Sequence, residues 1–170
     1  CLRGTNPAIA FFVGAALAEK SVLAEHDSLP PRAMTLNMDV AEPFYTPASG
    51  SLTIDHVGRC LAVFSPGLAE DVLKTKVGSE SEKSALDKAY SSTPECGVSK
   101  APEKIPALMQ RAAIAYGLEA WMRESAARAW NQRMMDRGAD SDKGKKGGRQ
   151  REGFHQGVRK INVRDGVIVD

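Results

Sequence analysis

Hydrophobic residues between about positions 52 and 135 recur at helical spacing. Ile54, Val57 and Leu61 are three and four residues apart, which places them on one face of a helix. A longer helix is predicted from about Ile105 to about Met135. Its apolar stripe consists of Leu108, Ala112, Ala115, Leu118 and Met122. These patterns predict an all-α protein made of small helical bundle units.

Two polar signals mark the starts of further helices. Ser65 precedes Pro66, a pair suited to the N-cap and the first position of a helix. Ser79 precedes Glu82 by three residues, which is the spacing of a capping box. We therefore expect a short helix after Ser65 and another after Ser79, with Cys96 in the loop beyond the second.

A strongly apolar run, Ala8 to Ala18, lies near the beginning of the sequence. It is shorter than the roughly 20 residues of a transmembrane helix, so we predict no transmembrane segment. It has the form of a signal-peptide core, with Arg3 before it and Ala16-Leu17-Ala18 as a cleavage site. The alternative is a buried helix from Pro7 to about His26, which we favour because the run is part of a repeated pattern.

That pattern follows two of the three cysteines, Cys1 and Cys96. Each is followed by Pro-Ala-aliphatic and then by Ala-Ala-aliphatic-Ala. These segments are Pro7–Ile9 with Ala15–Ala18, and Pro106–Leu108 with Ala112–Ala115. A repeat would make Cys1 the second cysteine of an earlier unit whose partner lies upstream. Alternatively, Cys1 is a lipidated residue or the first residue of a processed product.

The repeat divides the chain into four predicted segments. They are 1–25, the closing helix of a truncated first unit; 26–51, a Pro-rich flexible linker; 52–135, a complete helical unit with paired cysteines; and 136–170, a basic Gly-rich tail. A plain loop as long as 26–51 would be unusual in a compact domain, so a short helix is an alternative there. Phe44 and Tyr45 are its candidate anchors.

The order of these features resembles a group of uncharacterised exported proteins of alphaproteobacteria, often of sphingomonad type. The resemblance rests on a helix with a cysteine, a Gly78-to-Glu82 turn, a second cysteine and an Ala-rich helix, and covers residues 1–25 and 52–124. The segment Gly14–Glu19 is similar to the helix that closes their units. The resemblance implies a small helical protein of the periplasm or extracellular space, without a known activity. We expect its signal peptide to be missing from this chain.

In an exported protein, Cys60 and Cys96 would form a disulfide. They are 36 residues apart, and closing such a loop stabilises the fold by about 4 kcal/mol in the chain-entropy model. The alternative is two unrelated reduced cysteines, one of them buried in a helix face. No Cys-x-x-Cys pair is present, which disfavours catalytic redox chemistry.

The chain carries a net charge of only +2, but the charge is uneven. Between Arg137 and Arg164 there are nine basic and three acidic residues, so this stretch alone carries +6. Its composition predicts a disordered tail that could contact nucleic acid or an anionic envelope surface. The candidate anion contacts are Lys143, Lys145, Lys146, Arg149 and Arg151. Val167–Val169 has the composition of a short strand but no obvious partner.

Candidate catalytic and metal-binding residues are weak. No nucleophile elbow, His-Glu-x-x-His or phosphate-binding loop occurs, so we assign no catalytic residue, metal ligand or cofactor. His56 lies four residues before Cys60, but zinc needs further ligands. We expect a non-enzymatic structural or interaction role, with an enzyme of unrecognised type as an alternative. Trp121 and Trp130 suggest a protein partner at the long helix.

Overall fold

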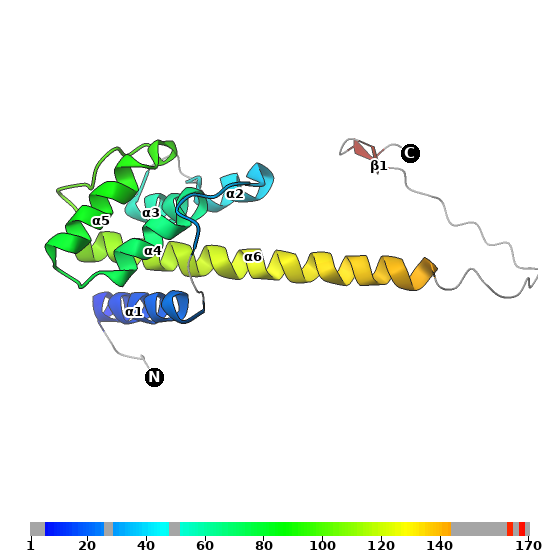
Figure 1. The fold of residues 1–170 in the computed structure, drawn as a ribbon, viewed down its shortest axis with the longest axis horizontal. Coiled ribbons are helices and arrows are strands. Elements are labelled where there is room, and N and C mark those ends of the chain that lie inside the picture. Colours follow the sequence, from blue (N-terminus) through cyan, green and yellow to red (C-terminus); the bar gives the residue numbers. More distant parts are fainter. Residues whose placement is uncertain (1–5, 26–28, 48–51, 144–162, 165–166, 169–170) are drawn as a thin grey trace, which may run out of the picture. The chain divides into compact units, whose positions relative to one another are not determined.

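The computed structural model describes residues 6–25, 29–47, 52–143, 163–164 and 167–168. The chain forms two compact units, Cys1–Asn131 and Gln132–Asp170. The elements in chain order are α1 (Pro7–Glu25), α2 (Met38–Tyr45), α3 (Ile54–Phe64), α4 (Pro66–Lys74), α5 (Glu80–Ser91), the 3₁₀ turn η1 (Pro94–Cys96), α6 (Ala107–Lys143), β1 (Val163–Arg164) and β2 (Val167–Ile168). Every regular element described in the first unit is helical, as the hydrophobic spacing predicts (Figure 1).

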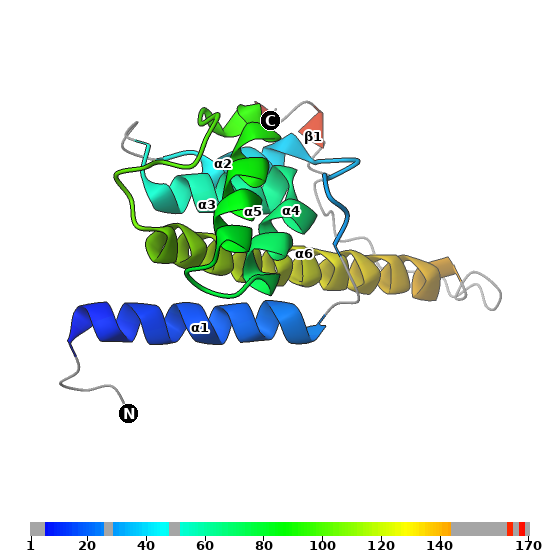
Figure 2. The same ribbon diagram turned by 60° about the vertical axis from the view of Figure 1, so that its left-hand side comes forward.

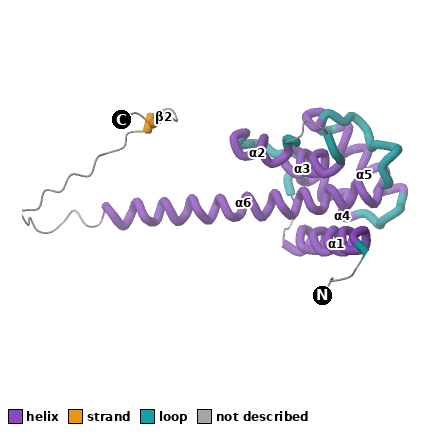
Figure 3. Tube along the Cα trace, turned by 180° about the vertical axis from the view of Figure 1, so that it is seen from behind, coloured by secondary structure: helices purple, strands orange, loops and turns teal. Residues whose placement is uncertain are grey.

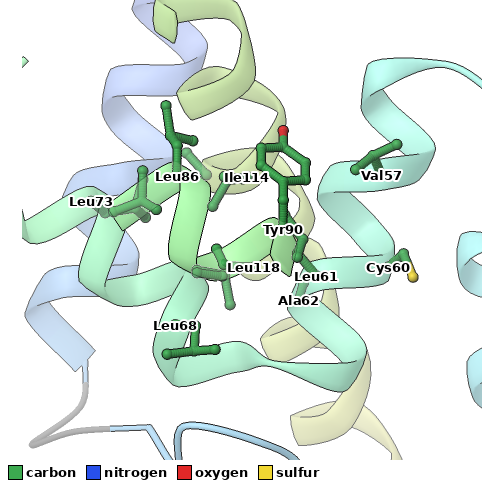
Figure 4. Packing of buried hydrophobic residues seen from close by; sticks show 14 of the residues in the cluster. Val57, Cys60, Leu61, Ala62, Leu68, Leu73, Leu86, Tyr90, Ile114 and Leu118 are labelled. Carbon is green, nitrogen blue, oxygen red and sulfur yellow. The ribbon is translucent and has the colours of Figure 1, made fainter. Parts of the chain in front are cut away.

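The core of the first unit lies where α3, α4 and α5 meet the first half of α6. Figure 4 shows the side chains that fill it, with Leu86 and Tyr90 from α5 and Ile114 from α6 among them. Each large apolar side chain that is buried in this way stabilises the fold by about 1.5–3 kcal/mol. The helical positions identified from the sequence, such as Leu61 and Leu118, belong to this core.

Helix α1 lies against the first half of α6 (Figure 2). The Tyr116 hydroxyl donates a hydrogen bond of 2.8 Å to the carbonyl oxygen of Phe11, and Arg111 contacts Glu19 further along α1. Ala18 and Val22 of α1 are buried in the common core. Within residues 8–18, however, only Ala15 and Ala18 are buried, so α1 is a helix packed on the bundle by one side rather than the buried helix that the sequence predicts. The repeat and the boundaries drawn at residues 25 and 52 stay predictions.

Helices α3 and α6 cross at two glycines. A Cβ atom at Gly117 would lie 2.6 Å from the carbonyl oxygen of Gly58, and one at Gly58 would lie 2.4 Å from the carbonyl oxygen of Ala113. Because backbone cannot give way as a flexible side chain can, the crossing requires residues without a side chain at both positions. Neither glycine was predicted from the sequence to be a contact point.

The two helix starts agree with the polar signals. Ser79 is the N-cap of α5, and its hydroxyl accepts a hydrogen bond of 3.2 Å from the backbone N–H of Glu82. The Glu82 carboxylate in turn accepts from the backbone N–H of Gly78 at 2.7 Å. Ser65 is the N-cap of α4, but its side chain does not cap the helix. Its buried hydroxyl lies 2.6 Å from the hydroxyl of Thr93 instead.

The predicted linker contains helix α2, and its earlier part is bonded to the bundle. The backbone N–H of Leu29 donates to the carboxylate of Glu70 at 3.1 Å, and the N–H of Gly67 donates to the carbonyl of Pro30 at 2.9 Å. The Phe44 ring packs on Trp121, with centroids 5.0 Å apart, so the predicted anchor is confirmed. Residues 26–28 and 48–51 lie outside the described residues.

The second unit begins inside α6, which continues as a helix to Lys143 rather than ending near Met135 (Figure 3). Residues 136–143 contain no proline, which would break the helix, and the single Gly138 weakens the helix without ending it. The two short strands pair in antiparallel register, with Val163 opposite Ile168. Val163 and Arg164 are therefore the strand partner that was not evident from the sequence. The interval 144–162, with most of the basic residues, lies outside the described part of the chain.

Candidate functional site

Cys60 and Cys96 form a disulfide between α3 and η1. Their Cα atoms are 5.6 Å apart, within the ordinary range for a disulfide, and both residues are buried. The pairing proposed from the sequence is therefore confirmed. Because disulfides form and persist in oxidising compartments, the bridge indicates a location outside the cytoplasm.

The disulfide also decides what the neighbouring histidine can do. Both sulfurs are bonded to each other, so neither is available as a thiolate ligand beside His56. The Nδ1 atom of His56 lies 2.7 Å from the hydroxyl of Thr53, at the start of α3. Among the described residues, no group of three or more His, Cys, Asp or Glu side chains is placed to hold a metal ion.

A buried arginine connects four helices. Arg111 of α6 is only 3% exposed, and its guanidinium forms ion pairs with Glu19 of α1 at 2.6 Å and Glu82 of α5 at 3.0 Å. It also donates to the carbonyl oxygens of Val72 and Leu73 at the end of α4, at 2.9 and 2.6 Å. The bonds to Glu19 are the main cause that raises the pKa of Arg111, and Glu82 raises it further.

The geometry of Arg111 suits a structural centre. All five guanidinium N–H donors have acceptors on the protein, so none is left to bind a ligand. The capping-box spacing predicts Glu82 at the start of a helix, and this residue does lie in the first turn of α5. Glu82 is also buried, as a partner of Arg111, which the sequence did not predict. The available signal was a lone arginine within the apolar stripe of the long helix.

Glu70 of α4 is a second buried carboxylate that joins two parts of the chain. Glu70 is buried, and it bonds to Lys74 at 3.0 Å as well as to the backbone of Leu29. Its carboxylate holds the earlier part of the linker against α4, which is a positioning role within the fold.

A groove with a volume of about 720 Å³ lies between α5 and residues 99–106. Leu86 and Gln110 line it, both buried, and exposed lysines and carboxylates surround it. The amide nitrogen of Gln110 donates to the carbonyl oxygens of Pro102 and Ile105, so this side chain fixes one wall of the groove. The oxygen of the same amide has no partner among the described residues.

The two tryptophans proposed as a partner surface have different surroundings. The ring of Trp121 packs against Phe44 of α2 within the bundle, so it is not available to a partner. Trp130 is 57% exposed, and Met134, one turn further along α6, is also exposed. Any partner surface on this helix would therefore centre on Trp130 rather than on both rings.

Helix α1 presents a second apolar surface. Its outward side, which we call the outer face of α1, consists of Ile9, Val13, Ala16, Leu17, Lys20 and Ala24, all exposed. By length and composition this is the one helix among the described residues that could cross a membrane. The window Pro7–Ala24 has 18 residues and a mean hydropathy of 1.5. A signal sequence or the core helix of a soluble protein can pass the same test.

Most of the residues predicted to contact anions lie outside the described part of the chain. Lys143 is the last residue of α6, and Lys145, Lys146, Arg149 and Arg151 lie outside the described residues. Comparison with known protein families, with curated proteins and with solved structures finds no match to this chain.

Proposed function

We propose that the chain is an exported protein of the periplasm or the extracellular space, with a structural or interaction role rather than a catalytic one. The observation that carries this proposal is the buried disulfide between Cys60 and Cys96. The bridge joins α3 to the segment before α6, and such a bond persists where cytoplasmic thiols do not reduce it. The resemblance to exported helical proteins of alphaproteobacteria supports the same assignment.

The interaction role is assigned to the exposed part of α6. Trp130 is 57% exposed, so its ring is accessible to a partner. Tryptophan is enriched among the residues that dominate binding energy at protein interfaces. A protein partner that covers Trp130 is therefore the occupant proposed for this surface.

Site-specific photo-cross-linking tests the partner assignment. A photoreactive phenylalanine is introduced at Trp130 in the exported full chain, and at exposed Lys104 as a matched control. A discrete product of one mass is expected from position 130 alone. An excess of unlabelled wild-type chain should remove this product, whereas the Trp130→Ala variant should not.

Two outcomes contradict the proposal. Equal cross-linking at both positions, or none at either, would show that Trp130 does not mark a partner surface. Peptide mass mapping without reduction tests the compartment: two free thiols at Cys60 and Cys96 in the exported chain would remove the basis for an extracytoplasmic location.

A further inference from the structure

The outer face of α1 is apolar although α1 is packed on the protein. Leu17 is 64% exposed and Ile9 is 54% exposed, and only 17% of the residues in the window Pro7–Ala24 are buried. A helix on the surface of a protein in water ordinarily carries polar residues on its outward side. On the side that the described part of the chain leaves exposed, this helix therefore has the composition of a buried helix.

The acidic and the basic side chain in the middle of α1 lie on different sides of the helix. Glu19 is its single acidic residue between Pro7 and Ala24, and it is turned inward onto Arg111. Lys20 is exposed and lies on the outer face. The outer face therefore combines large apolar side chains with one cation and no anion.

The apolar surface continues beyond α1. A depression of about 210 Å³ is lined mainly by apolar residues, among them Phe12 and Ala16 of α1 with Val77 and Leu108, and the ion pair of Glu19 with Arg111 also borders it. Val77 and Leu108 are both exposed, and Lys76, next to Val77, is exposed as well. Ile9 to Leu17 alone spans about 12 Å along the helix axis, and the depression widens the surface sideways.

The contacts of α1 with the bundle decide how it could meet a membrane. Arg111 is bonded to both carboxylate oxygens of Glu19, and Tyr116 is bonded to the backbone at Phe11. A helix that crossed the bilayer would break these bonds and leave the buried Arg111 without one of its two carboxylates. A helix that lies parallel to the membrane surface keeps all of them.

We propose that α1 is a membrane-surface helix whose outer face inserts into an anionic phospholipid bilayer. Ile9, Val13 and Leu17 would enter the region between headgroups and acyl chains, about 5–10 Å deep. Lys20 would extend its ammonium group to the lipid phosphates while its methylene stem stays in the apolar layer. This inference rests on the proposed function, since an exported protein meets the envelope membranes.

A second copy of the chain fits this face less well. In a two-fold symmetric pair the same face is presented by both partners. Lys20 would then be buried against another apolar surface that offers no carboxylate, and a buried unpaired charge is costly. Lipid phosphates supply the anion that the protein face lacks.

Vesicle co-sedimentation of the full chain tests the proposal. The vesicles contain phosphatidylethanolamine with phosphatidylglycerol, and vesicles of phosphatidylcholine alone measure the dependence on anionic lipid. The wild-type chain should sediment with the anionic vesicles. Leu17→Glu should lower the partition coefficient at least about tenfold, because it removes one inserted side chain and adds a charge.

Two matched variants identify the surface responsible. Met34→Glu replaces an apolar residue that is 93% exposed and lies outside α1, and it should leave sedimentation unchanged. The double variant Lys145→Gln with Lys146→Gln tests the basic tail and should also leave it unchanged. Circular dichroism of each variant should show the helical content of the wild type.

Each other outcome overturns the inference. The first is that the wild-type chain does not sediment with the vesicles. The second is that the tail variant loses sedimentation while Leu17→Glu keeps it. The third is that the wild-type chain forms a dimer that does not bind vesicles and that Leu17→Glu dissociates. Peptide mapping of the same sample separates the two proposals. An intact disulfide with no vesicle binding contradicts only the membrane helix, whereas free thiols contradict the exported location.

Discussion

At the scale of single residues, the bundle buries several polar groups, and nearly all of them have partners. Arg111, Glu82 and Glu70 are each bonded to charged or backbone groups. The buried hydroxyl group of Tyr90 is an exception. Its side chain is 1% exposed, and its hydroxyl has no hydrogen-bond partner in the described structure. A buried polar group without a partner destabilises the fold by about 1–3 kcal/mol.

We therefore expect Tyr90→Phe to raise the free energy of unfolding by about 1 kcal/mol, measured by urea denaturation at neutral pH. Tyr116→Phe is the matched control, because the Tyr116 hydroxyl donates to Phe11. It should lower the free energy of unfolding by about 0.5–1.5 kcal/mol. Equal changes for the two variants would show that the Tyr90 hydroxyl is satisfied.

The same tyrosine predicts a dependence on alkaline pH. Burial raises the pKa of Tyr90 above its ordinary value. The unfolded chain therefore releases the phenolic proton first, as the pH passes about 10, and the folded chain resists its loss. The contribution to stability is complete below that pH and declines above it. Urea titrations from pH 8 to about 11 should show a steeper decline for the wild type than for Tyr90→Phe.

At the scale of elements, the close crossing of α3 and α6 depends on Gly58 and Gly117. An alanine at Gly117 gains helix propensity of about 1 kcal/mol, but its Cβ meets backbone atoms at 2.6 Å. The helices must move apart to admit it, and the packing around Cys60 and Ile114 loosens with them. The steric effect therefore exceeds the gain in propensity.

Gly117→Ala should lower the free energy of unfolding by about 1–3 kcal/mol. Thermal unfolding followed by circular dichroism measures the change. Gly138→Ala is a control on the same helix, and because Gly138 belongs to the second unit it should not lower the stability of the first. A Gly117→Ala variant as stable as the wild type would contradict the close contact.

At the scale of the whole molecule, the disulfide closes a loop that contains α4 and α5. The residues between Cys60 and Cys96 supply Glu82 and the two α4 carbonyl groups that bind Arg111. The bridge and the arginine therefore constrain the same part of the bundle. Loss of the bridge should weaken this whole region rather than one contact.

The double variant Cys60→Ala with Cys96→Ala should lower the free energy of unfolding by about 2–4 kcal/mol. Denaturation of the wild type in excess thiol reductant should reproduce the effect. Cys1→Ala is the matched control and should not change stability, because Cys1 takes no part in this bridge. A double variant that unfolds with the wild-type midpoint would show that the bridge is not structural.

Local patterns along the chain were sufficient for much of the fold. The helices around Ile54, Leu68, Leu86 and Leu118 follow from hydrophobic spacing and caps, since both act within a few residues. The pairing of Cys60 with Cys96 could be proposed because only three cysteines are present. The basic tail was recognised by composition, and its proposed contacts with anions stay a prediction.

Contacts between distant residues were decided only by the tertiary structure. The sequence by itself determined an all-α chain, its helix starts and the candidate disulfide, because each depends on neighbours or on a small choice of partners. The tertiary structure decided that Arg111 joins Glu19 to Glu82, that Gly58 meets Gly117, and that the outer face of α1 is exposed among the described residues. These features depend on which surfaces face one another after the helices pack, and hydrophobic spacing within one helix does not specify its partner.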